Sequence, residues 1–134
     1  MRVVYERPPN FAEINDKFDI AGKSVIFAWA DVIFNPMRVD ISPALMVHEE
    51  MHASRQRRHG PEMWWRSYID SDRFRLEEEI LAHQVEYRER LRGAVNRSER
   101  RHILSTLAKR MAMPMYGKMI TRAAAKKVLI EARL

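Results

Sequence analysis

The segment His48-Glu49-Glu50-Met51-His52 constrains this chain more than any other part of it, because it reads H-E-x-x-H. Ser42 is a favourable N-cap residue, and Pro43 suits the first position of a helix, where its missing N–H costs nothing. The sequence therefore predicts a helix that begins here and carries the motif. Residues four apart lie on one face of a helix, so we expect His48 and His52 to point at the same ion.

The residue types of the motif predict a zinc site with hydrolytic chemistry. Two neutral imidazoles suit the tetrahedral preference of zinc, and Glu49 follows the first of them, where it can take a proton from a metal-activated water. The 134 residues include no cysteine, so histidines and carboxylates must supply every ligand. The alternative interpretation is an exposed helix that carries two histidines by coincidence.

A catalytic zinc has three protein ligands and one open position, so a third ligand is needed. The metzincin pattern requires a glycine three residues and a histidine six residues after His52, where this chain has Arg55 and Arg58. His59 comes one residue later, beside Gly60-Pro61, and could bind the metal only if the helix unwound there. We therefore expect the third ligand on another helix.

The acidic run at positions 77–79 supplies the favoured third ligand. Glu79 is preferred because Ala82, three residues later, lets two helices approach closely. His83, four residues after Glu79, is expected to hydrogen-bond in the second coordination shell. Glu78 is the alternative ligand, and a third possibility is that the whole run is solvated.

The pattern of apolar and polar residues outside the motif predicts one α+β domain, mainly α, over residues 1–134. Its length and its hydrophobic content of 46% suit one globular domain. Strands are expected at 2–6 and 24–29, while 31–34 either continues the second strand or pairs back on it. Helices are expected at 11–18, from 43 to about 59, around 64–68, at 74–91, from the cap at Asn96 to 111, and from the cap at Thr121 to 129. Trp64, Trp65 and Tyr68 are expected in the core rather than against a substrate.

The charge balance gives the main competing hypothesis. The net charge of +6 and the pI of about 10.0 favour anionic partners such as nucleic acid, although 18 acidic residues are interspersed among 24 basic ones. The basic stretches 55–58 and 97–101 could contact phosphates, with the metal then only structural. The N-terminal residues do not look like a signal peptide, and nothing approaches the roughly 20 apolar residues of a membrane span. We therefore expect a cytoplasmic protein that is not embedded in a membrane.

The motif together with the segment Glu79-Ile80-Leu81-Ala82 resembles the gluzincin metallopeptidases. In that family the H-E-x-x-H helix is followed by a glutamate on a second helix, often within E-x-x-A-D, and here His83 stands in place of the final aspartate. Longer stretches look like small proteins of phage and prophage genomes that are grouped with the metallopeptidases: 25–36, 48–56, 68–76 and 115–117. The resemblance implies a minimal zincin-like fold, with a small N-terminal sheet, the motif helix, a glutamate helix and two C-terminal helices.

These observations lead to zinc-dependent hydrolysis of a peptide or protein as the expected function. The candidate donors of a hydrogen bond to the oxyanion are, in descending order of preference, Tyr116, Tyr87 and His83. The strand around residues 27–29 could take up an extended peptide along its edge. The alternative is a basic protein associated with nucleic acid, or a protease acting near DNA, with a structural metal site.

Overall fold

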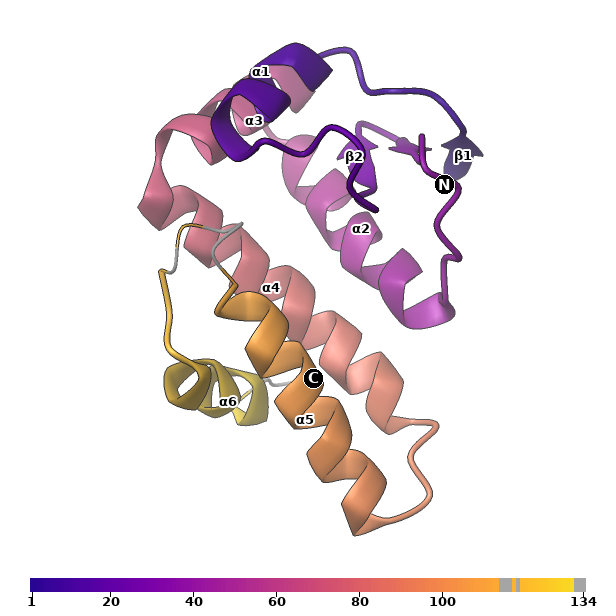
Figure 1. Ribbon diagram of the computed structural model, residues 1–134, viewed down its shortest axis with the longest axis vertical. Coiled ribbons are helices and arrows are strands. Elements are labelled where there is room, and N and C mark those ends of the chain that lie inside the picture. The colour runs from indigo at the N-terminus through magenta and orange to yellow at the C-terminus, as the bar shows by residue number, and fades with distance from the viewer. Residues whose placement is uncertain (114–116, 118, 132–134) are drawn as a thin grey trace.

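The computed structural model describes residues 1–113, 117 and 119–131, which form a small sheet and a larger set of helices (Figure 1). The expected α+β class, mainly α, is confirmed. The elements in chain order are β1 (Arg2–Val4), α1 (Phe11–Phe18), β2 (Phe27–Trp29), β3 (Val32–Phe34), α2 (Pro43–Gln56), α3 (Pro61–Asp70), α4 (Asp72–Leu91), α5 (Arg97–Met111) and α6 (Arg122–Ile130).

The sheet has the order β1-β3-β2, with β1 parallel to β3 and β2 antiparallel to it. Of the two possibilities for residues 31–34, pairing back is the one observed, with Trp29 opposite Val32. The tight turn between the strands places Ala30 in the left-handed region, at a φ of 51°, as a two-residue hairpin connection requires. Strand β2 therefore lies at an edge of the sheet.

Helix α2 begins where the cap signal placed it and presents the motif to α4. The Ser42 hydroxyl accepts a hydrogen bond from the Leu45 N–H at 3.1 Å, as an N-cap residue does. The helix ends at Gln56, three residues before the expected end, and Gly60 at a φ of 86° leads into α3. Helices α2 and α4 lie side by side (Figure 1). His48, Glu49 and His52 of the motif are on the buried face of α2.

Helix α4 buries an unusually polar face. It starts at Asp72, where the Ser71 hydroxyl accepts a hydrogen bond from the Phe74 N–H at 3.1 Å. Ala82 on this helix is completely buried, which fits the close approach to α2 that its small side chain was expected to allow. Apart from this alanine the buried residues of α4 are charged or polar: Arg75, Glu78, Glu79, His83 and Glu86.

Two hydrophobic clusters flank this polar contact between α2 and α4. The first joins α1, β2 and α3 and contains Ile14, Ile20, Phe27, Trp64, Trp65 and Tyr68. The second joins α5 and α6 and contains Leu107, Ala108, Met111, Ala125 and Leu129. Among the described residues, no helix combines the length and the apolar character that crossing a membrane demands.

Candidate metal centre

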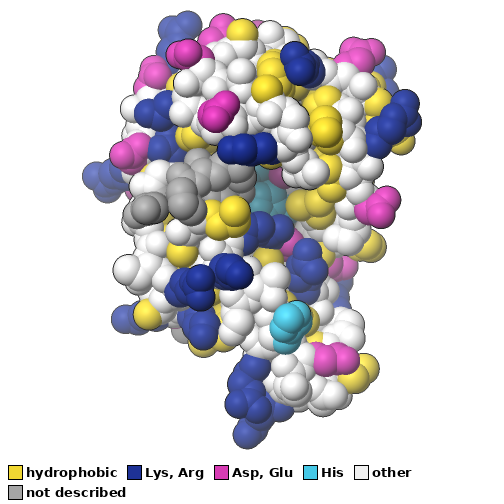
Figure 2. Space-filling view, viewed as in Figure 1, with side chains coloured by type: hydrophobic (Ala, Val, Ile, Leu, Met, Phe, Trp, Pro, Cys, Tyr) yellow, Lys and Arg dark blue, Asp and Glu magenta, His cyan; other side chains and the backbone are white. Residues whose placement is uncertain are grey.

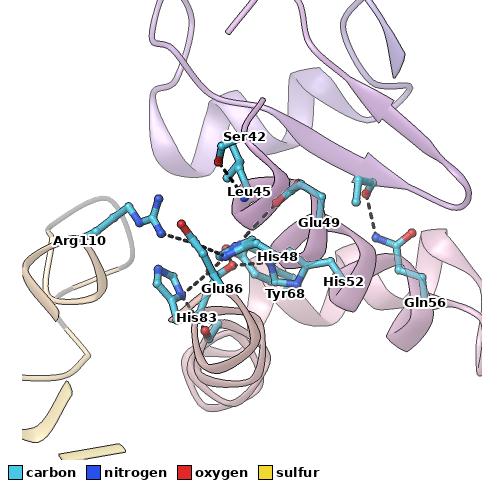
Figure 3. A network of polar contacts seen from close by, with 12 residues as sticks. Ser42, Leu45, His48, Glu49, His52, Gln56, Tyr68, His83, Glu86 and Arg110 are labelled. Atoms are coloured by element: carbon cyan, nitrogen blue, oxygen red, sulfur yellow. Dashed lines mark hydrogen bonds and ion pairs between the residues drawn. The ribbon is translucent and has the colours of Figure 1, made fainter. Parts of the chain in front are cut away.

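The two motif histidines and one carboxylate of α4 meet at a single buried point. Nε2 of His52 lies 3.1 Å from Oε2 of Glu79, and Nε2 of His48 lies 3.5 Å from Oε1 of the same carboxylate. All three residues are 5% exposed. Figure 3 shows both imidazoles leaving α2 on the side that faces α4. The structure thus brings together the three residues that the sequence suggested as ligands.

The other two glutamates of the acidic run point elsewhere. Glu77 is exposed and pairs with Arg73 at 3.1 Å, one turn away on the same helix. Glu78 is buried, but its carboxylate accepts hydrogen bonds from Arg55 at 3.0 Å and from the Trp64 indole at 2.8 Å. Glu79 is the member of the run whose carboxylate contacts the histidines, so the alternative of Glu78 as ligand has no geometric support.

Glu49 lies against the same point from α2. Its Oε2 is 3.6 Å from Nε2 of His48, and ligand atoms of Glu49, His48 and His52 all lie within 4.8 Å of one another. Burial raises the pKa of Glu49, against the opposing effect of the two imidazoles. A carboxyl group with a raised pKa beside a metal position is what a general base working near neutral pH requires.

The sequence did not lead us to predict Glu86, whose carboxylate forms a hydrogen bond with the Nδ1 side of the His48 imidazole. Nδ1 of His48 donates to Oε1 of Glu86 at 2.9 Å, and this carboxylate is completely buried. Arg90 pairs with its other oxygen at 2.9 Å. Arg110 on α5 pairs with Oε1 (Figure 3). A proton on Nδ1 leaves Nε2 of His48 available for a metal. The spacing of 79, 83 and 86 on one helix face was the signal that could have identified it.

His83 is buried behind His48 and does not line the pocket of the site. Its Nδ1 donates to the backbone carbonyl of Glu79 at 2.7 Å, and its ring centroid lies 4.7 Å from that of His48. Burial, together with the positive charge of His48, lowers the pKa of His83 to about 3. His83 is therefore neutral and occupies a supporting position. A second set of ligand atoms within 4.8 Å joins it to His48 and Glu86.

Tyr68 was expected in the core, and it lies there, but it also belongs to the site. Its hydroxyl donates to Oε2 of Glu79 at 2.6 Å, so α3 fixes the direction of this carboxylate. Two further sequence candidates lie elsewhere. Tyr87 packs against the cluster between α5 and α6, and His59 is exposed beyond the end of α2. Tyr116 lies outside the described residues.

The charges at this point favour a bound cation. Burial disfavours a proton on His48, yet the nearby carboxylates of Glu79 and Glu86 outweigh burial and raise its pKa to about 10. Despite burial, the imidazoles of His52 and His48 hold the pKa of Glu79 well below its usual range. Within the described residues, Oε1 of Glu79 and Nδ1 of His52 have no hydrogen-bond partner. A divalent ion fits this donor set of two imidazoles and a carboxylate.

A pocket of about 80 Å³ lies beside the candidate ligands. Figure 2 shows a histidine recessed in a hollow of the surface, beside hydrophobic side chains. The edge strand β2 contributes Phe27 and Ala28 to the lining. However, the carbonyl of Ala28 already accepts from Gln56 at 2.8 Å and from the Trp65 indole at 3.0 Å. An added peptide strand would find this acceptor occupied.

No family model matches the chain, and no curated protein or solved structure matches it either. The gluzincin resemblance therefore remains a prediction from the sequence.

Proposed function

We propose that this chain is a zinc-dependent peptidase of a minimal zincin-like type. The observation that carries the proposal is the convergence of Nε2 of His48, Nε2 of His52 and the carboxylate of Glu79 at one buried point. Oε2 of Glu49, on the same helix as the histidines, lies 3.6 Å from Nε2 of His48. A purely structural metal site would need no acid–base group there, so the position of Glu49 favours catalysis.

His48, His52 and Glu79 would hold the metal, and the set of two histidines and one glutamate is one that catalytic zinc uses. When bound, zinc supplies Lewis acidity, which lowers the pKa of a coordinated water toward ~7 and polarises a carbonyl oxygen. Glu86 and Tyr68 keep two of the ligands in place through their hydrogen bonds to His48 and Glu79. These contacts fix the ligand directions before the metal arrives.

Glu49 has the acid–base role in this proposal. Its carboxylate accepts a proton from the attacking water and delivers it to the nitrogen of the leaving amine, so one group serves both steps. Its buried position keeps it largely out of contact with bulk water, and its raised pKa makes it a stronger base for the first transfer, from the water. Tyr116 stays the sequence-based candidate for a donor to the oxyanion.

The test is the variant Glu49→Gln, which keeps the size and shape of the side chain and removes its basicity. We expect the variant to bind zinc like the wild type and to lose hydrolysis of a mixed peptide library by about 100-fold or more. Glu50→Gln, the neighbouring exposed glutamate, is the matched control and should retain activity. Hydrolysis that survives in Glu49→Gln would contradict the assigned role.

The nucleic-acid alternative has less support from the surface charges. In the stretch 55–58, Arg55 pairs with Glu78 at 3.0 Å and Arg57 pairs with Asp31 at 3.3 Å. Gln56 in the same stretch is buried. Two of its three arginines are thus already balanced by acidic partners, which leaves the exposed stretch 97–101 as the remaining basic candidate.

A further inference from the structure

The pocket beside the candidate ligands has an almost wholly apolar wall, and its composition bears on the substrate. The wall comes from α1, from the segment that leads into β2 and from α3. Its principal members are Ile14, Phe18, Val25, Ile26, Trp64 and Trp65. Polar lining is confined to the metal side, where the motif residues and Glu79 lie.

The hydrogen-bonding groups of the aromatic wall are already occupied by the protein itself. The indole of Trp64 donates to Glu78 at 2.8 Å, and the indole of Trp65 donates to the carbonyl of Ala28 at 3.0 Å. The hydroxyl of Tyr68 donates to Glu79 at 2.6 Å. A polar or charged substrate side chain that entered here would lose its water without gaining a partner from this wall, which disfavours its binding.

The size of the pocket narrows the choice further. It holds about 80 Å³ of space. An enclosed apolar cavity of about 150 Å³ accommodates one benzene molecule; this pocket, which is partly open to solvent, offers roughly half that volume, which favours a branched aliphatic group over an aromatic ring. Part of the space adjoins the two histidines, which reduces what remains for a side chain.

The backbone at this edge of the sheet contributes little to selection. A peptide that added to β2 would need the carbonyl of Ala28, which already accepts from Gln56 and Trp65. Recognition through main-chain hydrogen bonds is weakened at that position. The side chain next to the scissile bond must therefore supply more of the selectivity.

We propose that this pocket selects peptides with a branched aliphatic side chain, such as that of valine, leucine or isoleucine, next to the bond held at the metal centre. The inference rests on the proposed function, because it assumes that the substrate is a peptide positioned by zinc. It adds the substrate class, which neither the motif nor the ligand set specifies.

The test measures binding of four peptide hydroxamates to the zinc-loaded protein by calorimetry. The hydroxamate group binds zinc in each compound, and only the side chain differs: isobutyl, benzyl, 4-aminobutyl or 2-carboxyethyl. We expect the isobutyl compound to bind about tenfold tighter or more than each of the others. Equal affinities, or tighter binding of the benzyl or a charged compound, would overturn the pocket assignment while leaving the metal site intact.

Failure of the proposed function gives a different result. A chain that takes up no zinc, or a zinc-loaded chain that binds none of the four hydroxamates, contradicts the peptidase proposal and this inference together.

The contribution of the pocket wall to selectivity is checked in the variant Val25→Ala, which shortens one wall residue without removing a hydrogen bond. This variant should narrow or reverse the preference over the benzyl compound. Val95→Ala, the same change at a residue that is 78% exposed, should not alter it.

Discussion

Three consecutive glutamates on α4 show how strongly direction decides the role of a side chain. Glu77 faces solvent, Glu78 faces Arg55 and Trp64, and Glu79 faces the imidazoles. Each step along a helix turns the side chain by about 100°, so neighbours cannot share one partner. The same rule places residues 79, 83 and 86 together and gives His48 its second carboxylate.

Glu86 should control metal affinity although it is not a proposed ligand. The variant Glu86→Gln keeps the side-chain shape and loses the charge that fixes the proton on Nδ1 of His48. We expect zinc affinity to fall about 10- to 100-fold, as is typical when a partner of a ligating histidine is removed. Competition with a chromophoric chelator measures the change. Unaltered affinity would show that His48 needs no such partner.

Zinc affinity should rise steeply with pH in this protein. Glu79 and Glu86 overcome burial and raise the pKa of metal-free His48 to about 10, so near neutral pH a metal must displace its proton. One displaced proton makes affinity increase about tenfold per pH unit below that pKa. Chelator competition between pH 6 and pH 8 checks this expectation. Affinity that stays constant over this range would mean that His48 is already neutral in the metal-free protein.

At the scale of elements, the buried amide of Gln56 ties the motif helix to the hairpin. Its Nε2 donates to the carbonyl of Ala28 at 2.8 Å, and its Oε1 accepts from the N–H of Ala30 at 2.7 Å. The side chain is 1% exposed; its bond to Ala28 is buried, and its bond from Ala30 is partly buried. Gln56 thus fixes the position of β2, which lines the pocket, relative to the helix that carries the histidines.

Replacing this amide by an apolar group of similar size should destabilise the fold. In Gln56→Leu the N–H of Ala30 loses its partner, while Ala28 retains the Trp65 indole. An unsatisfied buried donor costs about 1–3 kcal/mol, and because Ala30 is only partly buried we expect the free energy of unfolding to fall by about 1 kcal/mol, the lower end of that range. Urea denaturation measures it. Val95→Ala is a suitable exposed control, and a Gln56→Leu variant as stable as the wild type would contradict this role.

The boundaries of the helices were largely predictable because their signals are local. The side chains of Ser42, Ser71, Asn96 and Thr121 all accept the backbone hydrogen bond expected of an N-cap. A cap needs only the next few residues, so the sequence contains the whole interaction. The end of α2 at Gln56 was not predicted, because the local sequence does not specify how many residues before Gly60 lie outside the helix.

The partners of the site residues were less predictable because they come from distant segments. Glu86 contacts His48 across 38 residues of sequence, and Tyr68 reaches Glu79 from α3. Such pairs depend on how α2, α3 and α4 pack, which no single helical pattern specifies. Glu79 could be favoured in advance because it accompanies the motif in the resemblance and precedes Ala82. The pairing of Glu78 with Arg55 and Trp64 could not be predicted in this way.

In the molecule as a whole, the polar contact between α2 and α4 lies between two separate hydrophobic clusters (Figure 1). The N-terminal cluster supplies the pocket wall, and α5 of the C-terminal cluster supplies Arg110 to Glu86. Buried charges in such a contact are stabilised only by their partners, and removal of one partner is costly. A metal ion in this position would link α2 to α4 through His48, His52 and Glu79.

The decisive measurement for zinc binding by His48, His52 and Glu79 is the zinc content of the purified protein and of the variants Glu79→Ala and Glu77→Ala. We expect about one zinc per chain in the wild type and in Glu77→Ala, whose side chain is exposed, and almost none in Glu79→Ala. Circular dichroism would show whether each variant retains its helices. A folded Glu79→Ala that binds zinc as fully and tightly as the wild type, or a wild type that binds none, would contradict the account.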